Sequence, residues 1–167
     1  VLGQPPRVGS FESAMESVRV FDTDWGRIPT VGMRDLVELK KTQRIDDCPI
    51  VGRLALLHLE QTEPDAATLQ WVLSNVMTLD EVRILFRDYG AVLEHAAVAL
   101  PEPLARHVDE LRSEVELTES AEDEIDAWLA GRIFALRKAD RYYWRPIIDE
   151  LGRLRRSGDL MPEGEPV

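Results

Sequence analysis

The amino-acid sequence predicts a mainly α-helical protein with a small β-hairpin near its N-terminus, an α+β fold in which a helical bundle follows the strand pair. Two observations carry this prediction. Residues 18–23 alternate apolar and polar side chains and are rich in strand formers. From residue 34 onward, apolar residues recur at the three- and four-residue spacing of helices. At 167 residues and 44% hydrophobic content, the chain can bury an ordinary single-domain core.

The first fifty residues supply the predicted non-helical part. Residues 1–9 contain Pro5 and Pro6 and are expected to be an extended connector, after which Ser10 can cap a short helix over residues 11–17. Residues 24–26 (Asp-Trp-Gly) are a turn signal, and residues 28–31 form the return strand, where Pro29 is compatible only with an edge position. A hairpin alone is barely stable in water. We therefore expect these strands to pack on helices or to join a sheet whose other strands lie outside this chain.

The remaining chain predicts successive helices separated by short breaks. Pro49 interrupts the first of them, Asp65 caps a later one, and Thr78 with Glu81 forms a capping box. Gly90 is expected to end that helix, and Pro146 is expected to start or kink the last one, which ends at Ser157-Gly158. The predicted helical stretches are 34–43, 50–60, 65–76, 78–90, 91–99, 103–115, 120–136 and 146–157. We expect a helical bundle over residues 51–160 and a flexible tail over residues 161–167.

Composition excludes several classes of function. The net charge of −11 argues against general nucleic-acid binding, which needs clustered Lys and Arg. Cys48 is the single cysteine, so no internal disulfide framework is expected, and a reducing, cytoplasmic setting is favoured. No apolar run reaches the length of a membrane span.

Charge is distributed unevenly along the second half of the chain. Residues 109–126 contain nine carboxylates and one arginine, whereas residues 132–156 carry eight Lys or Arg side chains. We favour the interpretation that these are solvated helix faces of opposite sign that lie next to each other. The alternative is a local basic patch for an anionic ligand. The acidic 109–126 segment could also meet a basic protein partner.

The segment 31–47 contains the best candidates for a functional site. Lys40 and Arg44 are four residues apart, and Asp47 follows three residues later, so a continuous helix would place all three on one side. Such a face can hold a triphosphate while the acid orients a cation. On spacing alone, an ordinary exposed cationic pair with a nearby acid is the more common explanation of this pattern.

Several short motifs in order give this segment a family resemblance: Gly9-Ser-Phe-Glu-Ser-Ala, Val18-Arg-Val-Phe, Trp25-Gly-Arg-Ile-Pro-Thr-Val, Met33-Arg-Asp-Leu-Val-Glu-Leu-Lys and Arg44-Ile-Asp-Asp47. Residues 1–50 resemble the second half of a minimal nucleotidyltransferase domain of the polymerase-beta superfamily, in its abortive-infection and toxin–antitoxin branch. The resemblance implies that Lys40 and Arg44 contact nucleotide phosphates and that Asp47 is a catalytic, orienting acid. It also implies Mg²⁺ and an NTP as cofactors and transfer of an NMP to an unknown acceptor. The Gly-Ser turn and Asp-x-Asp pair that hold Mg²⁺ in the family are expected upstream of the matching residues.

Other chemistry-bearing residues favour structural roles. Asp22 and Asp24 form the one Asp-x-Asp of the chain, but Asp24 begins a turn and is expected to act there. Arg141-Tyr-Tyr-Trp-Arg145 could stack nucleic-acid bases, although core or helix-junction roles are favoured. The competing class of function is a non-enzymatic helical interaction protein, such as an antitoxin-like or adaptor subunit.

Overall fold

A computed structural model describes residues 7–42, 44–113 and 115–159 of the chain. It confirms a mainly α-helical fold with one antiparallel β-hairpin near the N-terminus. In chain order the elements are α1 (Phe11–Glu16), β1 (Arg19–Thr23), β2 (Gly26–Thr30), α2 (Met33–Lys40), the 3₁₀ turn η1 (Ile45–Asp47), α3 (Cys48–Glu60), α4 (Ala66–Leu73), α5 (Leu79–His95), α6 (Glu102–Arg106), α7 (Val108–Ser113) and α8 (Glu119–Ser157).

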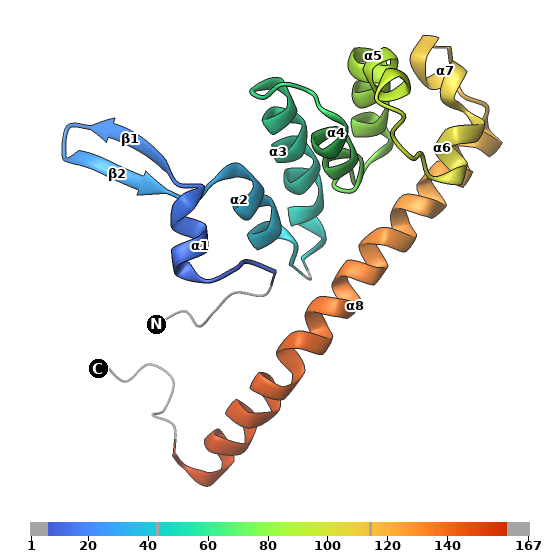
Figure 1. Cartoon of the computed structure of the whole chain (residues 1–167). Helices are drawn as coiled ribbons and strands as arrows, with labels where there is room; N and C mark the ends of the chain where they lie inside the picture. The colour runs from blue at the N-terminus through green and yellow to red at the C-terminus, as the bar shows by residue number, and fades with distance from the viewer. Residues whose placement is uncertain (1–6, 43, 114, 160–167) are drawn as a thin grey trace.

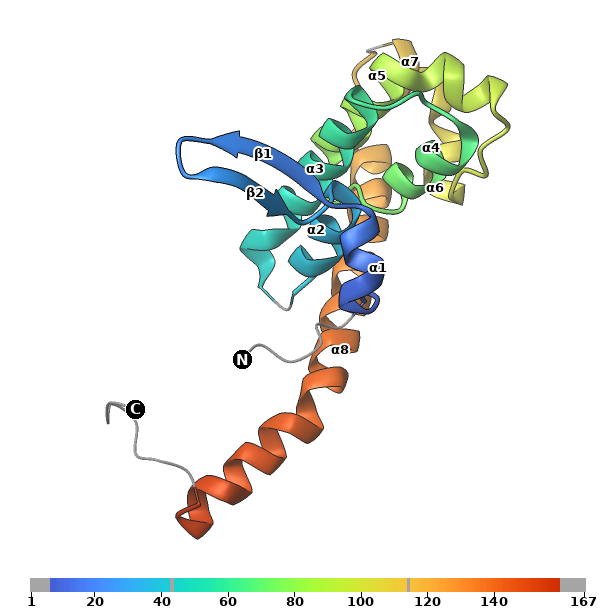
Figure 2. The same ribbon diagram turned by 60° about the vertical axis from the view of Figure 1, so that its left-hand side comes forward.

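Helices α3 to α7 and the first half of α8 form the body of the molecule. The hairpin projects from one side of the body, and α8 continues beyond it as a long rod (Figures 1 and 2). No helix among the described residues is both long and apolar enough to cross a membrane.

The main core joins the helices of the body. Its largest fully buried side chains include Leu59 of α3, Leu69 of α4, Phe86 of α5, Leu104 of α6 and Ile125 of α8. Apolar side chains at helical spacing place one face of each helix inward, and their removal from water is the main stabilising contribution.

A second, smaller core holds α2 in place. Val37 of α2 is fully buried with Cys48 and Val51 of α3, and Ile133 and Leu136 of α8 pack against this cluster. The N-terminal segment is thereby fixed to the body through α3. The predicted domain boundary at residue 50 lies inside α3, which begins at Cys48 with Pro49 in its first turn.

The predicted capping box at the start of α5 is confirmed. The Thr78 hydroxyl accepts a hydrogen bond from the Glu81 N–H, and the Glu81 carboxylate accepts from the Thr78 N–H. The same carboxylate accepts from the Met77 N–H at 2.7 Å and is buried against α3. Burial raises the pKa of Glu81, while the two backbone donors act in the opposite direction. Gly52 of α3 makes the close approach possible, because a Cβ there would lie 1.9 Å from Glu81 Oε2.

The hairpin follows the predicted turn and strand positions. Phe21 pairs with Ile28 and Asp22 with Arg27, and residues 24–25 form the turn. Gly26 has φ +106°, a value that residues with a Cβ rarely adopt. Glycine is therefore the residue that suits the third position of the Asp-Trp-Gly turn. Trp25 at the tip is 92% exposed.

Two predicted helix boundaries are wrong, and so is the start of a new helix at Pro146, one of the two alternatives for that residue. Helix α5 runs through Gly90 to His95, so no separate helix begins at residue 91, and the predicted helix 103–115 is divided into α6 and α7. Gly90 serves packing: a Cβ there would lie 2.7 Å from Cγ of Arg112 in α7. Helix α8 continues through Pro146, although proline cannot donate the hydrogen bond to the carbonyl four residues earlier. That carbonyl belongs to Tyr142, which is highly exposed, so water can satisfy it. The end at Gly158, with φ +79°, is confirmed.

Candidate functional site

The three sequence-predicted site residues lie around the connection between α2 and α3. Lys40 is the last residue of α2, Arg44 has extended backbone (φ −80°, ψ 125°), and Asp47 ends η1 and is the N-cap of α3. The expectation that they share one face of a continuous helix is therefore wrong. The chain leaves the helix at Lys41, where ψ is 69°, and a loop carries Arg44 to the next helix.

Lys40 and Asp47 are nevertheless brought together. Lys40 Nζ lies 3.9 Å from Asp47 Oδ1, and the two side chains are 42% and 16% exposed. The Asp47 carboxylate is therefore mostly covered, while the Lys40 ammonium stays accessible. At this exposure the ion pair contributes little to stability, so its value as an orienting contact is the more relevant property.

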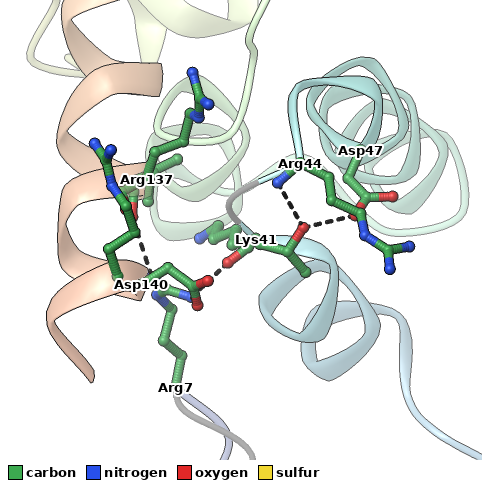
Figure 3. Close-up of polar contacts among 9 residues, drawn as sticks. Arg7, Lys41, Arg44, Asp47, Arg137 and Asp140 are labelled. Atoms are coloured by element: carbon green, nitrogen blue, oxygen red, sulfur yellow. Dashed lines mark hydrogen bonds and ion pairs between the residues drawn. The ribbon is translucent and has the colours of Figure 1, made fainter. Parts of the chain in front are cut away.

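Thr42 connects Asp47 to Arg44. Its hydroxyl donates to Asp47 Oδ2 at 2.7 Å and accepts from the Arg44 N–H at 3.1 Å. This arrangement fixes the loop backbone beside the acid, a role that the sequence analysis missed because Thr42 carries no charge. The Arg44 side chain is exposed, and Figure 3 shows its guanidinium pointing away from α8.

A second polar cluster anchors the N-terminal segment beside this loop. Arg7 donates to the Lys41 carbonyl and, at 3.5 Å, to the Leu136 carbonyl of α8. Its guanidinium also lies 3.5 Å from Asp140 Oδ1 (Figure 3). Asp140 is almost fully buried, and its only signal in the sequence is an acidic residue at a core-facing position of a helix.

His58 belongs to a packed cluster between α2, α3 and α4. Arg34 Nε donates to His58 Nε2 at 3.2 Å, and its guanidinium lies over the Trp71 ring, 5.0 Å from the centroid. Burial lowers the pKa of His58, and the nearby Arg34 and Arg19 lower it further. We assign this cluster a structural role because its groups contact each other.

Other candidates also have local explanations. Asp24 lies in the hairpin turn as expected, and Asp22 lies 3.7 Å from Arg27 across the strands, with both side chains exposed. Cys48 is buried, which raises the pKa of its thiol and favours the inert form. Within the described part of the chain, no group of three His, Cys, Asp or Glu side chains could hold a metal ion.

In the ion pairs that the structure gives, the acidic segment 109–126 and the basic segment 132–156 pair with other residues and not with each other. Glu122 pairs with Arg83 of α5, and Glu124 pairs with Arg106 of α6. In the basic segment, Arg153 pairs with Glu150 one turn away in the same helix. The acidic segment thus binds arginines of the body, and part of its charge is already neutralised.

No protein-family model, curated protein or solved structure matches this chain. The resemblance of residues 1–50 to nucleotidyltransferases stays a prediction from the sequence.

Proposed function

We propose that the α2–α3 connection is the phosphate-contacting wall of a nucleotidyltransferase-type nucleotide site. Lys40 and Arg44 are the phosphate-binding cations, and Asp47 is the acid that orients Lys40. The observation that carries the proposal is the 3.9 Å approach of Lys40 to Asp47 across a loop, next to the exposed Arg44.

The geometry leaves donors available to a ligand. A lysine ammonium has three N–H donors, and Asp47 occupies one side of it. An arginine guanidinium has five donors in a planar fork that matches phosphate oxygens. Both side chains are accessible, since Lys40 is 42% exposed and Arg44 is exposed, so each could donate to phosphate oxygens.

Nucleotidyl transfer would need more than this wall. Mg²⁺ prefers clustered carboxylate oxygens, and the described residues do not supply such a cluster. The hairpin is a two-stranded sheet with exposed apolar side chains such as Phe21, which is consistent with a sheet that further strands complete. We therefore propose NTP binding for the residues present, and transfer of an NMP to an acceptor only together with metal-binding strands. The single buried cysteine favours a reducing, cytoplasmic location.

Calorimetric titration with each Mg–NTP and with inorganic triphosphate tests this proposal. We expect saturable binding that weakens about tenfold or more in Lys40→Ala and in Arg44→Ala, since each loses a charge-assisted hydrogen bond worth roughly 1.5–3 kcal/mol. Lys138→Ala, which removes an exposed lysine from α8, is the matched control and should bind as the original chain does. Absence of binding by the unmodified chain, or unchanged affinity in Lys40→Ala, would refute the proposal.

A second candidate is a non-enzymatic helical interaction protein, such as an antitoxin-like or adaptor subunit. It is favoured by the exposed apolar side chains of Phe11 in α1 and of Phe21 and Trp25 in the hairpin. Under this proposal, proteins that co-purify with the chain should be lost in the double variant Phe21→Thr with Trp25→Ser. The same variant should keep its helical circular dichroism, because neither side chain belongs to a core cluster.

A further inference from the structure

Arg7 joins the end of α2 to the middle of α8. Its guanidinium donates to the Lys41 carbonyl at the C-cap of α2 and, at 3.5 Å, to the Leu136 carbonyl of α8. It also lies 3.5 Å from Oδ1 of Asp140 (Figure 3). The planar fork of an arginine presents five N–H donors in fixed directions, so one side chain can bond acceptors on two helices at once.

The backbone of Arg7 has a conformation that its own sequence does not favour. Its φ is +72°, in the left-handed region that residues with a Cβ rarely adopt. Residues persist in this region where their surroundings over-determine the conformation. The surroundings here are the three acceptors of the guanidinium, two of which belong to α8. The contacts of the side chain therefore account for the backbone conformation.

Asp140 gives Arg7 a rigid support. It is 3% exposed, and Arg7 is the cation that the structure pairs with it. A buried carboxylate is costly without a cation, so this pair is not easily exchanged for water. The helix that carries Asp140 is itself fixed nearby, because Ile133 and Leu136 pack on the second core.

The Lys41 carbonyl lies where the chain leaves α2, at a residue with ψ 69°. The last carbonyls of a helix have no donor within the helix, and a cation at this end also suits the helix dipole. The peptide group is planar, so a fixed Lys41 carbonyl also fixes the direction of the Thr42 N–H. Thr42 in turn donates its hydroxyl to Asp47 and accepts from the Arg44 N–H. The contact of Arg7 thus acts on the first residue of the loop that carries the candidate site.

We propose that Arg7 is a positioning residue for the α2–α3 connection. Supported by Asp140, it holds the Lys41 carbonyl against α8, and the loop that starts there brings Asp47 to Lys40. Arg7 itself is not a phosphate ligand, because its guanidinium is engaged by acceptors of the protein and its side chain is 21% exposed. An effect on nucleotide affinity rests on the proposed function. The positioning does not, because it is a property of the nucleotide-free chain.

The space around Arg7 predicts that its removal displaces the connection without unfolding the chain. Beside it lies a hollow of about 500 Å³, lined by Arg7, Ala139, Tyr142, Tyr143 and Pro146. In Arg7→Ala the space left by the side chain joins this hollow, so water can satisfy the Lys41 carbonyl. Water does not tie that carbonyl to α8, so the peptide group can turn.

Amide resonances of the nucleotide-free chain test the positioning directly. We expect the resonances of Thr42 and of residues 44–47 to shift in Arg7→Ala. Arg132→Ala is the matched control, because Arg132 also donates to backbone carbonyls at a helix end, in this case the end of α4. It should shift resonances of α4 and leave those of the α2–α3 connection in place.

A double variant separates positioning from stability. Asp140→Leu together with Arg7→Ala removes the unpaired buried carboxylate, so most of the stability lost in Arg7→Ala should return. It restores no donor to the Lys41 carbonyl, so the resonances of the α2–α3 connection should stay shifted. If these resonances returned to their original positions along with the stability, Arg7 would have a structural role alone and the proposal would be overturned.

Titration with inorganic triphosphate measures the consequence for ligand binding. Arg7→Ala should weaken binding by about threefold or more, because the Lys40 and Asp47 side chains lose their fixed relation. The double variant should bind as weakly as Arg7→Ala although it is more stable. Unshifted resonances in Arg7→Ala, or unchanged affinity of Arg7→Ala where the original chain binds triphosphate, would overturn the proposal. If the original chain binds no triphosphate but the resonances shift as expected, the proposed function fails and the positioning role stands.

Discussion

Replacing Gly52 by alanine tests whether the Glu81 carboxylate, buried against α3, stabilises the start of α5 through its bonds to the Met77 and Thr78 N–H groups. A Cβ at position 52 would lie 1.9 Å from Oε2, 2.2 Å from Cδ and 2.5 Å from Oε1 of Glu81. All three distances are far below van der Waals contact, so the carboxylate or the α3 backbone must move. The carboxylate is the only acceptor that the structure gives to the Met77 and Thr78 N–H groups.

The expected loss of stability follows from the two hydrogen bonds that the displacement of the carboxylate breaks. Each hydrogen bond to a charged group contributes roughly 1.5–3 kcal/mol, and a displaced carboxylate leaves both N–H groups without this acceptor. Exchange of glycine for alanine inside a helix returns about 1 kcal/mol. We therefore expect the free energy of unfolding to fall by about 2–5 kcal/mol, a large effect for the addition of one methyl group.

Urea unfolding followed by far-ultraviolet circular dichroism measures this change. Gly131→Ala is the matched control, because a Cβ there meets no atom within 4 Å and α8 should gain up to about 1 kcal/mol. In a Glu81→Ala background the clash is gone, so Gly52→Ala should leave stability unchanged or raise it by up to about 1 kcal/mol. Equal cost of Gly52→Ala in both backgrounds would refute the reasoning, as would an increase in stability of the single variant.

Three further predictions concern the hairpin, His58 and the Arg7–Asp140 pair. Gly26→Ala should shift the hairpin amide resonances toward disordered values without affecting the helices, because φ +106° strains any residue with a Cβ. The pKa of His58 is lowered in the folded state, so its contribution to stability is present above about pH 6.5 and is lost as pH falls through the folded value. His58→Gln should remove that part of the pH dependence of urea unfolding. Arg7→Ala should lower the free energy of unfolding by about 1–3 kcal/mol, because it leaves a buried carboxylate unpaired, and Asp140→Leu in the same chain should recover most of the loss.

For each of these predictions, one experimental result would contradict it. Uniform shifts across the helices in Gly26→Ala would mean that the hairpin is not an independent unit. The same fall in stability between pH 7.5 and pH 5.5 in His58→Gln and in the unmodified chain would remove His58 as the cause. If Asp140→Leu with Arg7→Ala were less stable than Arg7→Ala alone, Asp140 would have a role beyond its pair with Arg7.

The fold class could be predicted because its signals are local. Alternation over residues 18–23, the Asp-Trp-Gly turn and the Thr78–Glu81 capping box depend on near neighbours, and all are found in the structure. Gly90 misled the prediction of a helix end, and Pro146 misled the alternative of a new helix start, because glycine and proline are common at helix boundaries. Here the missing side chain of Gly90 lets Arg112 approach α5. Pro146 lies in the exposed half of α8, where water can replace the hydrogen bond that proline cannot donate.

The candidate site was predicted in part. The sequence analysis placed Lys40 near Asp47 on the assumption of a continuous helix, and the structure achieves the approach through a loop fixed by Thr42. The contact between Arg7 and Asp140 joins residues 133 positions apart. No local pattern encodes such a contact, so sequence reasoning could identify neither residue.

The continuity of α8 through Pro146 has a consequence for how its two halves are arranged. If Pro146 had ended the helix, Tyr143 and Ile147 would belong to separate elements, and no common face would exist. Because the helix continues, the face of α8 that packs on Val37 of α2 through Ile133 and Leu136 runs on to Tyr143 and Ile147, which are 40% and 41% exposed. Arg7 lines the hollow beside Tyr142 and Pro146 of this helix, and its guanidinium also donates to the Lys41 carbonyl at the end of α2. The end of α2 and the middle of α8 are thus connected through one arginine.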